Sequence, residues 1–306
     1  MPDPGRRPAK HHPESIPGRV VASYGKRVLI EDDQRNRRNC QLKGRRLKAV
    51  CGDHVEWYPD NQNGVVTAIS KRSNELRRPD SRGRIEILAA NISQLGVVIA
   101  AKPEVDEFLA DRYLAAARLM GADNLVVCNK SDLGSLGLAD EYEAIGYPVV
   151  RVSAKSGESL ELLAAALKGH TSVLVGQSGV GKSSLSNALI PGLAVATQTL
   201  SEGSGEGRHT TSTAILHHLP GGGEIIDSPG VRDFAPPPTE LTRVDFGFPE
   251  FDEALQQCRF NDCLHLKEPQ CGVREAVESG EISARRYRSY RELLHLMRRL
   301  QENQGG

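Results

Sequence analysis

The chain has 306 residues, and its composition of 39% hydrophobic and 25% charged residues excludes disordered and fibrous proteins. Its 39 Lys and Arg residues balance its 39 Asp and Glu residues overall, but the first 88 residues hold 19 basic and 11 acidic side chains. No apolar run approaches the roughly 20 residues that cross a bilayer, and the first residues lack a secretory apolar stretch, so we expect a cytoplasmic protein without a membrane partner.

The basic first section is predicted to contain a disordered tail over residues 1–13 and an OB-type β-barrel over residues 14–88. Segments rich in β-branched residues alternate with turn residues there, at 19–21, 27–30, 53–57 and 64–69. Five-stranded barrels of the OB type commonly bind oligonucleotides, and the excess of basic residues suggests that this section meets a polyanion. The pattern does not exclude a ligand-free barrel with a solvated, arginine-rich surface.

Residues 89–249 alternate between apolar strands and helical stretches, which is typical of a mostly parallel sheet covered by helices. A helix with Leu109, Tyr113 and Met120 on one face is expected to end at Gly121. Buried strands are predicted at 95–100, 125–127, 149–152, 172–175 and 225–226. This section is therefore predicted to be an α/β domain.

Two polar motifs at the ends of these strands predict a guanine-binding site. N-K-S-D follows the strand at 125–127, and S-A-K follows the strand at 149–152. The Asp132 carboxylate could accept two N–H groups of guanine, whereas adenine would leave it unpaired. Asn129 and Lys130 would brace the loop and cover the base. The predicted base-binding residues are Asn129, Lys130, Ser131, Asp132, Ser153, Ala154 and Lys155.

The strongest motif is G-Q-S-G-V-G-K-S, which matches the phosphate-binding loop pattern and lies between an apolar strand and a helix-forming run. Its glycines let backbone N–H groups turn toward a phosphate, and the helix N-terminus adds its positive dipole end. Lys182 would reach the β- and γ-phosphates, and Ser183 would ligate Mg²⁺. The predicted phosphate-binding residues are Gly176, Gln177, Ser178, Gly179, Val180, Gly181, Lys182, Ser183 and Ser184.

Two further motifs predict nucleotide-dependent switches. In D-S-P-G, Asp227 would hold Mg²⁺ through water and the Gly230 N–H would sense the γ-phosphate. In G-R-H-T-T, Thr210, preferred over Thr211, would complete the Mg²⁺ shell only when the γ-phosphate is present. Val231 follows where Ras-like enzymes place a glutamine, so we expect a low intrinsic rate. His209 is the candidate catalytic residue, or else a surface or packing residue.

The order of these motifs is itself informative, because both base-binding motifs precede the phosphate-binding loop and the switches. Ordinary Ras-like GTPases begin with the phosphate-binding loop, so the chain is predicted to be a circularly permuted GTPase. Such rearrangement is tolerated when the termini of a domain lie near one another. It places D-S-P-G just before the C-terminal region, to which the nucleotide state could then be relayed.

Residues 250–306 are predicted to form a helical zinc-binding module. Cys258, Cys263, His265 and Cys271 supply the Cys₃His set of a closed, structural zinc site with one Zn²⁺ per chain. The alternative is a group of reduced, buried cysteines. The basic segment 285–299 carries Tyr287 and Tyr290. It is interpreted as an RNA-binding helix, as an amphipathic helix that packs on the zinc module, or as both on opposite faces.

The barrel, the permuted motifs and the C-x₄-C-x-H-x₅-C module together resemble the RsgA/YjeQ/YloQ family of small ribosomal subunit GTPases. The resemblance covers nearly the whole chain after the first dozen or so residues. It implies a late-acting assembly factor whose barrel and zinc module touch ribosomal RNA near the decoding region. It also implies GTP hydrolysis stimulated by the subunit, release on hydrolysis, and a catalytic role for His209. We expect a monomer.

Two other functions are compatible with the motifs. The chain could be an RNA-binding scaffold in which the nucleotide is a fixed structural ligand, because the usual glutamine is missing. It could also be a GTPase that acts on transfer RNA or on membranes, although no amphipathic anchor is evident. Gly179 stands where potassium-activated relatives use asparagine, so no potassium requirement is predicted.

Overall fold

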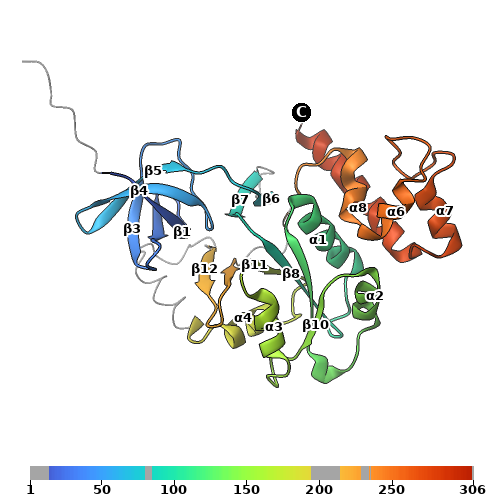
Figure 1. Cartoon of the computed structure of the whole chain (residues 1–306), viewed down its shortest axis with the longest axis horizontal. Helices are drawn as coiled ribbons and strands as arrows, with labels where there is room; N and C mark the ends of the chain where they lie inside the picture. Colours follow the sequence, from blue (N-terminus) through green and yellow to red (C-terminus); the bar gives the residue numbers. More distant parts are fainter. Residues whose placement is uncertain (1–13, 80–84, 194–213, 229–233, 235, 305–306) are drawn as a thin grey trace, which may run out of the picture.

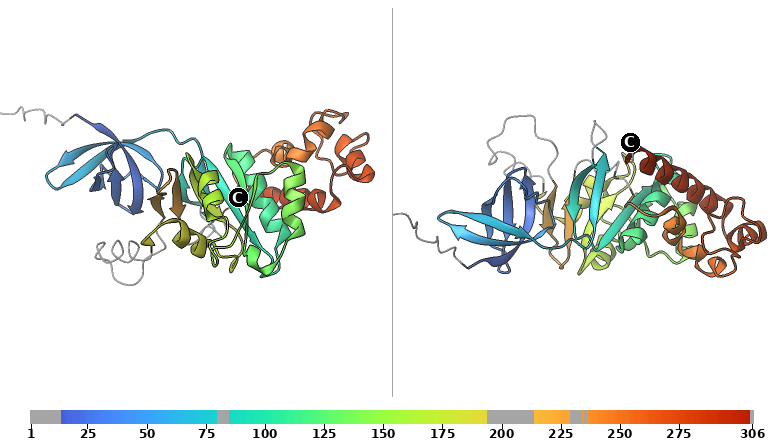
Figure 2. Two further views of the ribbon diagram at one scale, coloured as in Figure 1. Left: turned by 60° about the horizontal axis from the view of Figure 1, so that its bottom comes forward. Right: turned by 90° about the horizontal axis from the view of Figure 1, so that it is seen from above.

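A computed structural model describes residues 14–79, 85–193, 214–228, 234 and 236–304. The predicted tail, residues 1–13, lies outside the described residues. Three bodies follow one another along the long axis of the molecule (Figure 1): a β-barrel, a central sheet flanked by helices, and a helical C-terminal region. The same order is visible from two other directions (Figure 2). The predicted fold class is confirmed, and the predicted domain boundaries stay predictions.

The N-terminal barrel closes through pairing of its first and fourth strands. In chain order its strands are β1 (Ile16–Tyr24), β2 (Arg27–Glu31), β3 (Arg37–Leu42), β4 (His54–Asp60) and β5 (Asn63–Ile69). They pair in the order β1-β2-β3-β5-β4, and β4 returns to β1. Alternate residues such as Val20, Ile30 and Trp57 point inward and form one apolar cluster. Strand β4 thus has one buried face, whereas β1 and β2 are buried on both, because Val21 and Leu29 on their opposite faces belong to the core cluster of the central body.

A two-stranded ribbon connects the barrel to the central sheet. It consists of β6 (Glu75–Pro79) and β7 (Ile85–Ala90), which are antiparallel. Cys51 of the barrel forms an isolated bridge with Ala89 of the ribbon. The chain then enters β8 (Gln94–Ala100), all of whose residues are buried. The ribbon therefore passes the chain directly from the barrel into the core of the central body.

The central sheet has the order β10-β9-β8-β11-β13-β12, and only β12 is antiparallel to its neighbour. Its remaining strands are β9 (Asp123–Asn129), β10 (Val149–Val152), β11 (Thr171–Val175), β12 (Ile215–His218) and β13 (Glu224–Asp227). The helices that accompany it are α1 (Glu107–Met120), α2 (Gly137–Ile145), α3 (Leu160–Leu167) and α4 (Lys182–Leu189). Because the other strands are parallel, the loops that follow β9, β10, β11 and β13 gather at one edge, where ligands bind in such sheets.

The barrel and the central sheet meet at strand β12. Ala22 of β1 pairs with Ile215, so the hydrogen-bonded sheet continues from one body into the other. Around this contact, His218 lies 2.5 Å from Glu31 of the barrel and 3.4 Å from Glu224. Arg19 of the barrel also pairs with Glu224. The junction thus combines strand pairing with contacts between acidic and basic side chains.

The C-terminal region packs on helix α1. Its elements are η3 (Leu241–Gly247), η4 (Pro249–Phe251), α6 (Asp252–Leu255), α7 (Gly272–Ser279) and α8 (Ala284–Gln304). Ala115 of α1 belongs to the same apolar cluster as Phe248, Phe251 and Tyr290. The Arg286 guanidinium is fully buried and lies 2.6 Å from both Asp111 of α1 and Glu250. Buried charges fix this region against the central body.

Candidate functional site

The predicted base- and phosphate-binding motifs come together at the carboxyl edge of the central sheet. The phosphate-binding loop follows β11, the N-K-S-D motif lies at the end of β9, and the S-A-K motif follows β10. Asp227 is the last residue of β13. Ser183 and Ser184 lie exposed in the first turn of α4. Three predicted residues, His209, Thr210 and Gly230, lie outside the described residues. The described residues therefore form the base-binding and phosphate-binding sides of the predicted site.

The phosphate-binding loop curls around its own lysine. The Lys182 ammonium donates to the carbonyl oxygens of Gly176 and Gln177, each at 2.7 Å. Gly176 has a φ of 141°, and a Cβ there would lie 2.3 Å from the Val98 carbonyl oxygen. Glycine is therefore required at this position, both for its backbone angle and for the close approach of β8. The loop presents the backbone curvature that surrounds a phosphate.

Asn129 ties three of the loops together. Its side chain is buried, its Nδ2 donates to the Val180 carbonyl at 2.8 Å, and its Oδ1 accepts from the Ala154 N–H at 3.1 Å. A Cβ at Gly181 would lie 2.3 Å from Asn129 Nδ2, so the loop approaches this amide at van der Waals range. The buried amide therefore holds the base-binding motifs in register with the phosphate-binding loop.

Lys130 and Asp132 complete the base-binding side. The Lys130 ammonium donates to the carbonyl oxygens of Gly179 at 2.7 Å and Lys102 at 2.8 Å, so its stem spans the loop. Asp132 is exposed, and its Oδ1 accepts from the Ser153 hydroxyl at 2.6 Å. The structure places Ser131 within 2.8 Å of Glu158, and Lys155 is exposed beside Ala154. An oriented, accessible carboxylate is what recognition of guanine requires.

Asp227 lies at the end of β13, and burial raises the pKa of its carboxyl above the ordinary value. A half-buried carboxylate with a raised pKa next to a phosphate-binding loop is a place where a cation would offset the cost of desolvation. This donor fits the predicted Mg²⁺ together with the Ser183 hydroxyl. When bound, Mg²⁺ would neutralise phosphate charge.

The sequence motifs did not reveal the support behind the phosphate-binding loop. The Asp106 N–H donates to Gln177 Oε1 at 3.1 Å, and the Asp106 side chain caps α1 through the Leu109 N–H at 2.9 Å. Pro103 is the nearest residue to a Cβ built at Gly179. No local pattern marks residues 102–106 as part of the site, because the contact arises only when β8 and β11 lie side by side.

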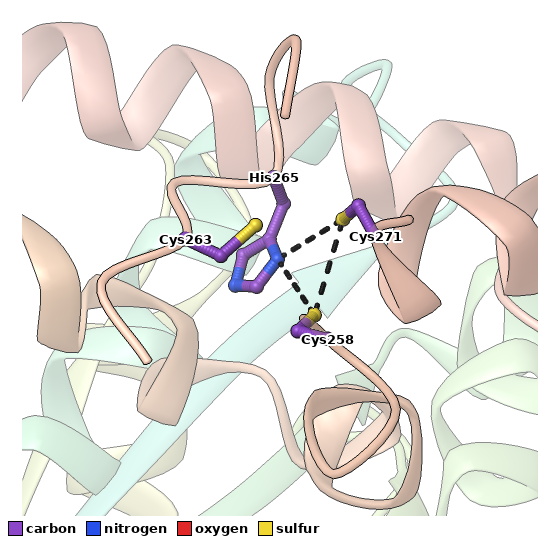
Figure 3. A group of neighbouring side chains, drawn as sticks. All are labelled: Cys258, Cys263, His265 and Cys271. Carbon is purple, nitrogen blue, oxygen red and sulfur yellow. Dashed lines mark hydrogen bonds between the residues drawn. The ribbon is translucent and has the colours of Figure 1, made fainter. Parts of the chain in front are cut away.

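The structure brings the four predicted zinc ligands together (Figure 3). All four donor atoms lie within 4.8 Å of one another. His265 Nδ1 lies 3.5 Å from Cys258 Sγ and 3.3 Å from Cys271 Sγ, and the two sulfur atoms are 4.0 Å apart. Tetrahedral ligands about 2.3 Å from Zn²⁺ lie about 3.8 Å from one another, so this group fits one zinc ion.

Neighbouring groups hold these four residues in place, and one of them, Asp245, was missed by the sequence analysis. His265 Nε2 lies 3.3 Å from the buried Asp245 carboxylate, an arrangement that turns the Nδ1 lone pair toward the sulfur atoms. The Tyr287 and Tyr290 hydroxyls donate to the carbonyl oxygens of His265 and Leu264, at 2.5 and 2.9 Å. The two tyrosines thus contact the zinc loop, as the packing interpretation of helix 285–299 predicted.

Comparisons with known proteins agree with this geometry. The family model for RsgA GTPase matches residues 69–236. A curated relative from Ectopseudomonas mendocina (strain ymp) is 45% identical over 289 residues, which cover 90% of this chain and 84% of the relative. The chain belongs to the RsgA GTPase family. That relative and a 44% identical one from Pseudomonas aeruginosa (strain LESB58), which covers 92% of this chain and 85% of its own, are both called small ribosomal subunit biogenesis GTPase RsgA.

Solved structures extend the RsgA likeness over nearly the whole chain. YjeQ from Thermotoga maritima has a TM-score of 0.76 and 34% identity and covers 92% of this chain and 98% of its own. YloQ, described as a circularly permuted GTPase, has a TM-score of 0.73 and 28% identity and covers 95% of this chain and 98% of its own. The predicted family is confirmed. None of the described helices is long and apolar enough to span a membrane.

Proposed function

We propose that this protein is a GTP-hydrolysing assembly factor for late maturation of the small ribosomal subunit. Its GTP form would bind the subunit and its RNA, and hydrolysis to GDP and phosphate would release it. The observation that carries the proposal is the buried Asn129 amide, which joins the base-binding loops to the phosphate-binding loop at one sheet edge. This geometry supports a purine triphosphate site that selects guanine.

Each residue has a defined part in the proposed site. Asp132 would accept the N–H groups of guanine, and Lys182 would leave its two carbonyl partners for the β- and γ-phosphates. Ser183 and Thr210 would ligate Mg²⁺, and Asp227 would hold it through water. Gly230 would sense the γ-phosphate, and His209 would position the attacking water.

The Cys₃His group would hold one structural Zn²⁺. Burial raises the pKa of the Cys263 thiol to about 12, so a cation is needed to keep the sulfur deprotonated in the folded protein. The surrounding loop contains little regular structure of its own. The zinc would therefore supply folding free energy to the C-terminal region rather than reactivity.

The barrel and the C-terminal region are proposed to contact ribosomal RNA from the two ends of the molecule. The names of the relatives connect the family with biogenesis of the small subunit. Because Val231 replaces the usual glutamine, the isolated protein is expected to turn over slowly, as a cytoplasmic monomer, until the subunit accelerates hydrolysis.

The decisive experiment measures GTP turnover with and without purified small subunits. The proposal expects slow turnover alone and acceleration by small subunits but not by large subunits, with Lys182→Ala inactive in both. Unchanged turnover would favour a scaffold that carries nucleotide as a fixed ligand. Equal binding of ATP and GTP would contradict the guanine site itself.

A further inference from the structure

An open groove of about 460 Å³ lies on the barrel, between the β3–β4 loop and the segment that leaves β5. We call it the basic groove. It is lined by Arg46, Leu47, Lys48, Ile69, Ser70, Lys71, Arg72 and Glu75. None of these residues belongs to the nucleotide motifs or the zinc group, so the basic groove is a separate feature.

Three lining cations have no acidic partner among the residues that the structure describes. Arg46, Lys48 and Lys71 are exposed and form no ion pair with any residue in the described part of the chain. The single acidic lining residue, Glu75, is already neutralised, because its carboxylate oxygens lie 2.9 Å from Arg72 and 2.6 Å from Arg77. The groove therefore carries a net positive charge that a mobile or bound anion must balance.

The floor of the basic groove is fixed by Arg72, which is largely buried. Its Nε and Nη2 donate to the two oxygens of Asp53 at 2.7 and 2.8 Å, and Asp53 is fully buried. Arg72 Nη2 also donates to the Lys48 carbonyl at 2.9 Å, and Asp53 accepts from the Val50 N–H at 2.8 Å. These bonds hold the cationic loop in place before any ligand arrives, which lowers the ordering cost of binding.

We propose that the basic groove binds the phosphodiester backbone of RNA. Its open form and its separate cations suit a run of phosphates rather than one enclosed anion, and half-buried Leu47 and Ile69 offer apolar contact to a ribose or base. This proposal rests on the proposed function and adds the place on the barrel. OB folds commonly bind through strands 2 and 3 and the loops after strands 1 and 4, whereas the basic groove uses the β3–β4 loop.

Two variants with equal loss of charge separate these surfaces. The groove variant carries Arg46→Gln, Lys48→Gln and Lys71→Gln. The control variant carries Lys26→Gln, Arg27→Gln and Arg35→Gln, which lie at the β1–β2 and β2–β3 turns and are also exposed. Dissociation constants of the full chain are measured over a salt series for purified small subunits. The same series is run for an oligouridylate of about 16 nucleotides, the upper site size of one OB fold.

The groove variant should bind RNA at least tenfold more weakly. Its slope of log affinity against log salt should fall by about two, since each lost phosphate contact removes about 0.7. The control variant should keep most of the RNA affinity and most of the salt slope. Both variants should bind GTP like the wild type. An unchanged slope in the groove variant, an equal loss in both variants, or a preference for polyglutamate over RNA would overturn the proposal. Wild-type protein that binds neither subunits nor RNA would instead refute the proposed function.

Discussion

His217 is a buried histidine at the junction of barrel and sheet, and its Nε2 has no hydrogen-bond partner among the described residues. Burial, together with the nearby positive charges of Arg37 and His218, lowers the pKa of His217 from 6.5 to about 4. The folded protein therefore holds this imidazole neutral over a pH range in which the unfolded chain binds a proton. The contribution of neutral His217 to the free energy of unfolding is present above pH 6.5 and is lost as the pH falls toward 4.

His217→Leu should flatten this part of the pH dependence. Between neutral pH and about pH 5, the free energy of unfolding of the wild type should fall by about 2 kcal/mol more than that of the variant. Urea unfolding at a series of pH values measures the difference. Parallel curves for the two proteins would show that His217 is not responsible.

Asp132 is the residue on which the proposed choice of base depends. Asp132→Asn removes a charged acceptor for two guanine N–H groups, so GTP affinity should fall by roughly ten- to a hundredfold, while xanthosine triphosphate should bind relatively better. Competition titrations of the two nucleotides measure the ratio. Asp140→Asn, an exposed carboxylate on α2, is the matched control. Unchanged discrimination would remove Asp132 from its proposed role.

At the scale of elements, the turn η3 places the Asp245 carboxylate against His265, twenty residues further along the chain in the group proposed to hold zinc. Asp245→Ala should free the His265 ring and lower zinc affinity by about 10- to 100-fold, the usual effect of losing such a partner. Competition with a coloured chelator measures the affinity directly. Glu240→Ala, which removes an exposed carboxylate just before η3, should leave it unchanged. Equal zinc retention by both variants would contradict the orienting role.

Helices α1 and α8 are joined by charges that lie out of water. Asp111 accepts from Arg285 at 2.7 Å, from Arg286 at 2.6 Å and from the Tyr142 hydroxyl at 2.7 Å. Removing one partner of a buried ion pair leaves the other charge buried without compensation. Arg286→Met should therefore destabilise the protein by about 3–5 kcal/mol. Arg151→Met breaks only exposed pairs and should cost under about 1 kcal/mol.

A double-mutant cycle tests whether the Arg286 effect comes from this contact. Combining Arg286→Met with Asp111→Asn should cost less than the sum of the two single changes, by about 1 kcal/mol or more, because they share one interaction. Denaturant unfolding of the four proteins gives the coupling energy. Strict additivity would show that packing rather than charge explains the loss.

At the scale of the whole molecule, local motifs predicted the fold class and the composition of the sites. The phosphate-binding loop and the Cys₃His spacing are short patterns whose chemistry depends on residues within one segment, so a single sequence carries them. The contacts between the three bodies could not be predicted in this way. Arg19 meets Glu224, and Asp111 meets Arg286, across more than a hundred residues each. No periodicity or motif marks such pairs, since they exist only once the elements are assembled.

Strand β12 is short and would be the edge strand of the central sheet if Ala22 of β1 did not pair with its Ile215. A rim with open backbone donors and acceptors is a template on which other chains can add strands. The barrel therefore occupies part of this edge and leaves less of it open to other chains. Fragments that lack the barrel would expose β12 as an edge strand, so we expect them to aggregate more readily than the full chain.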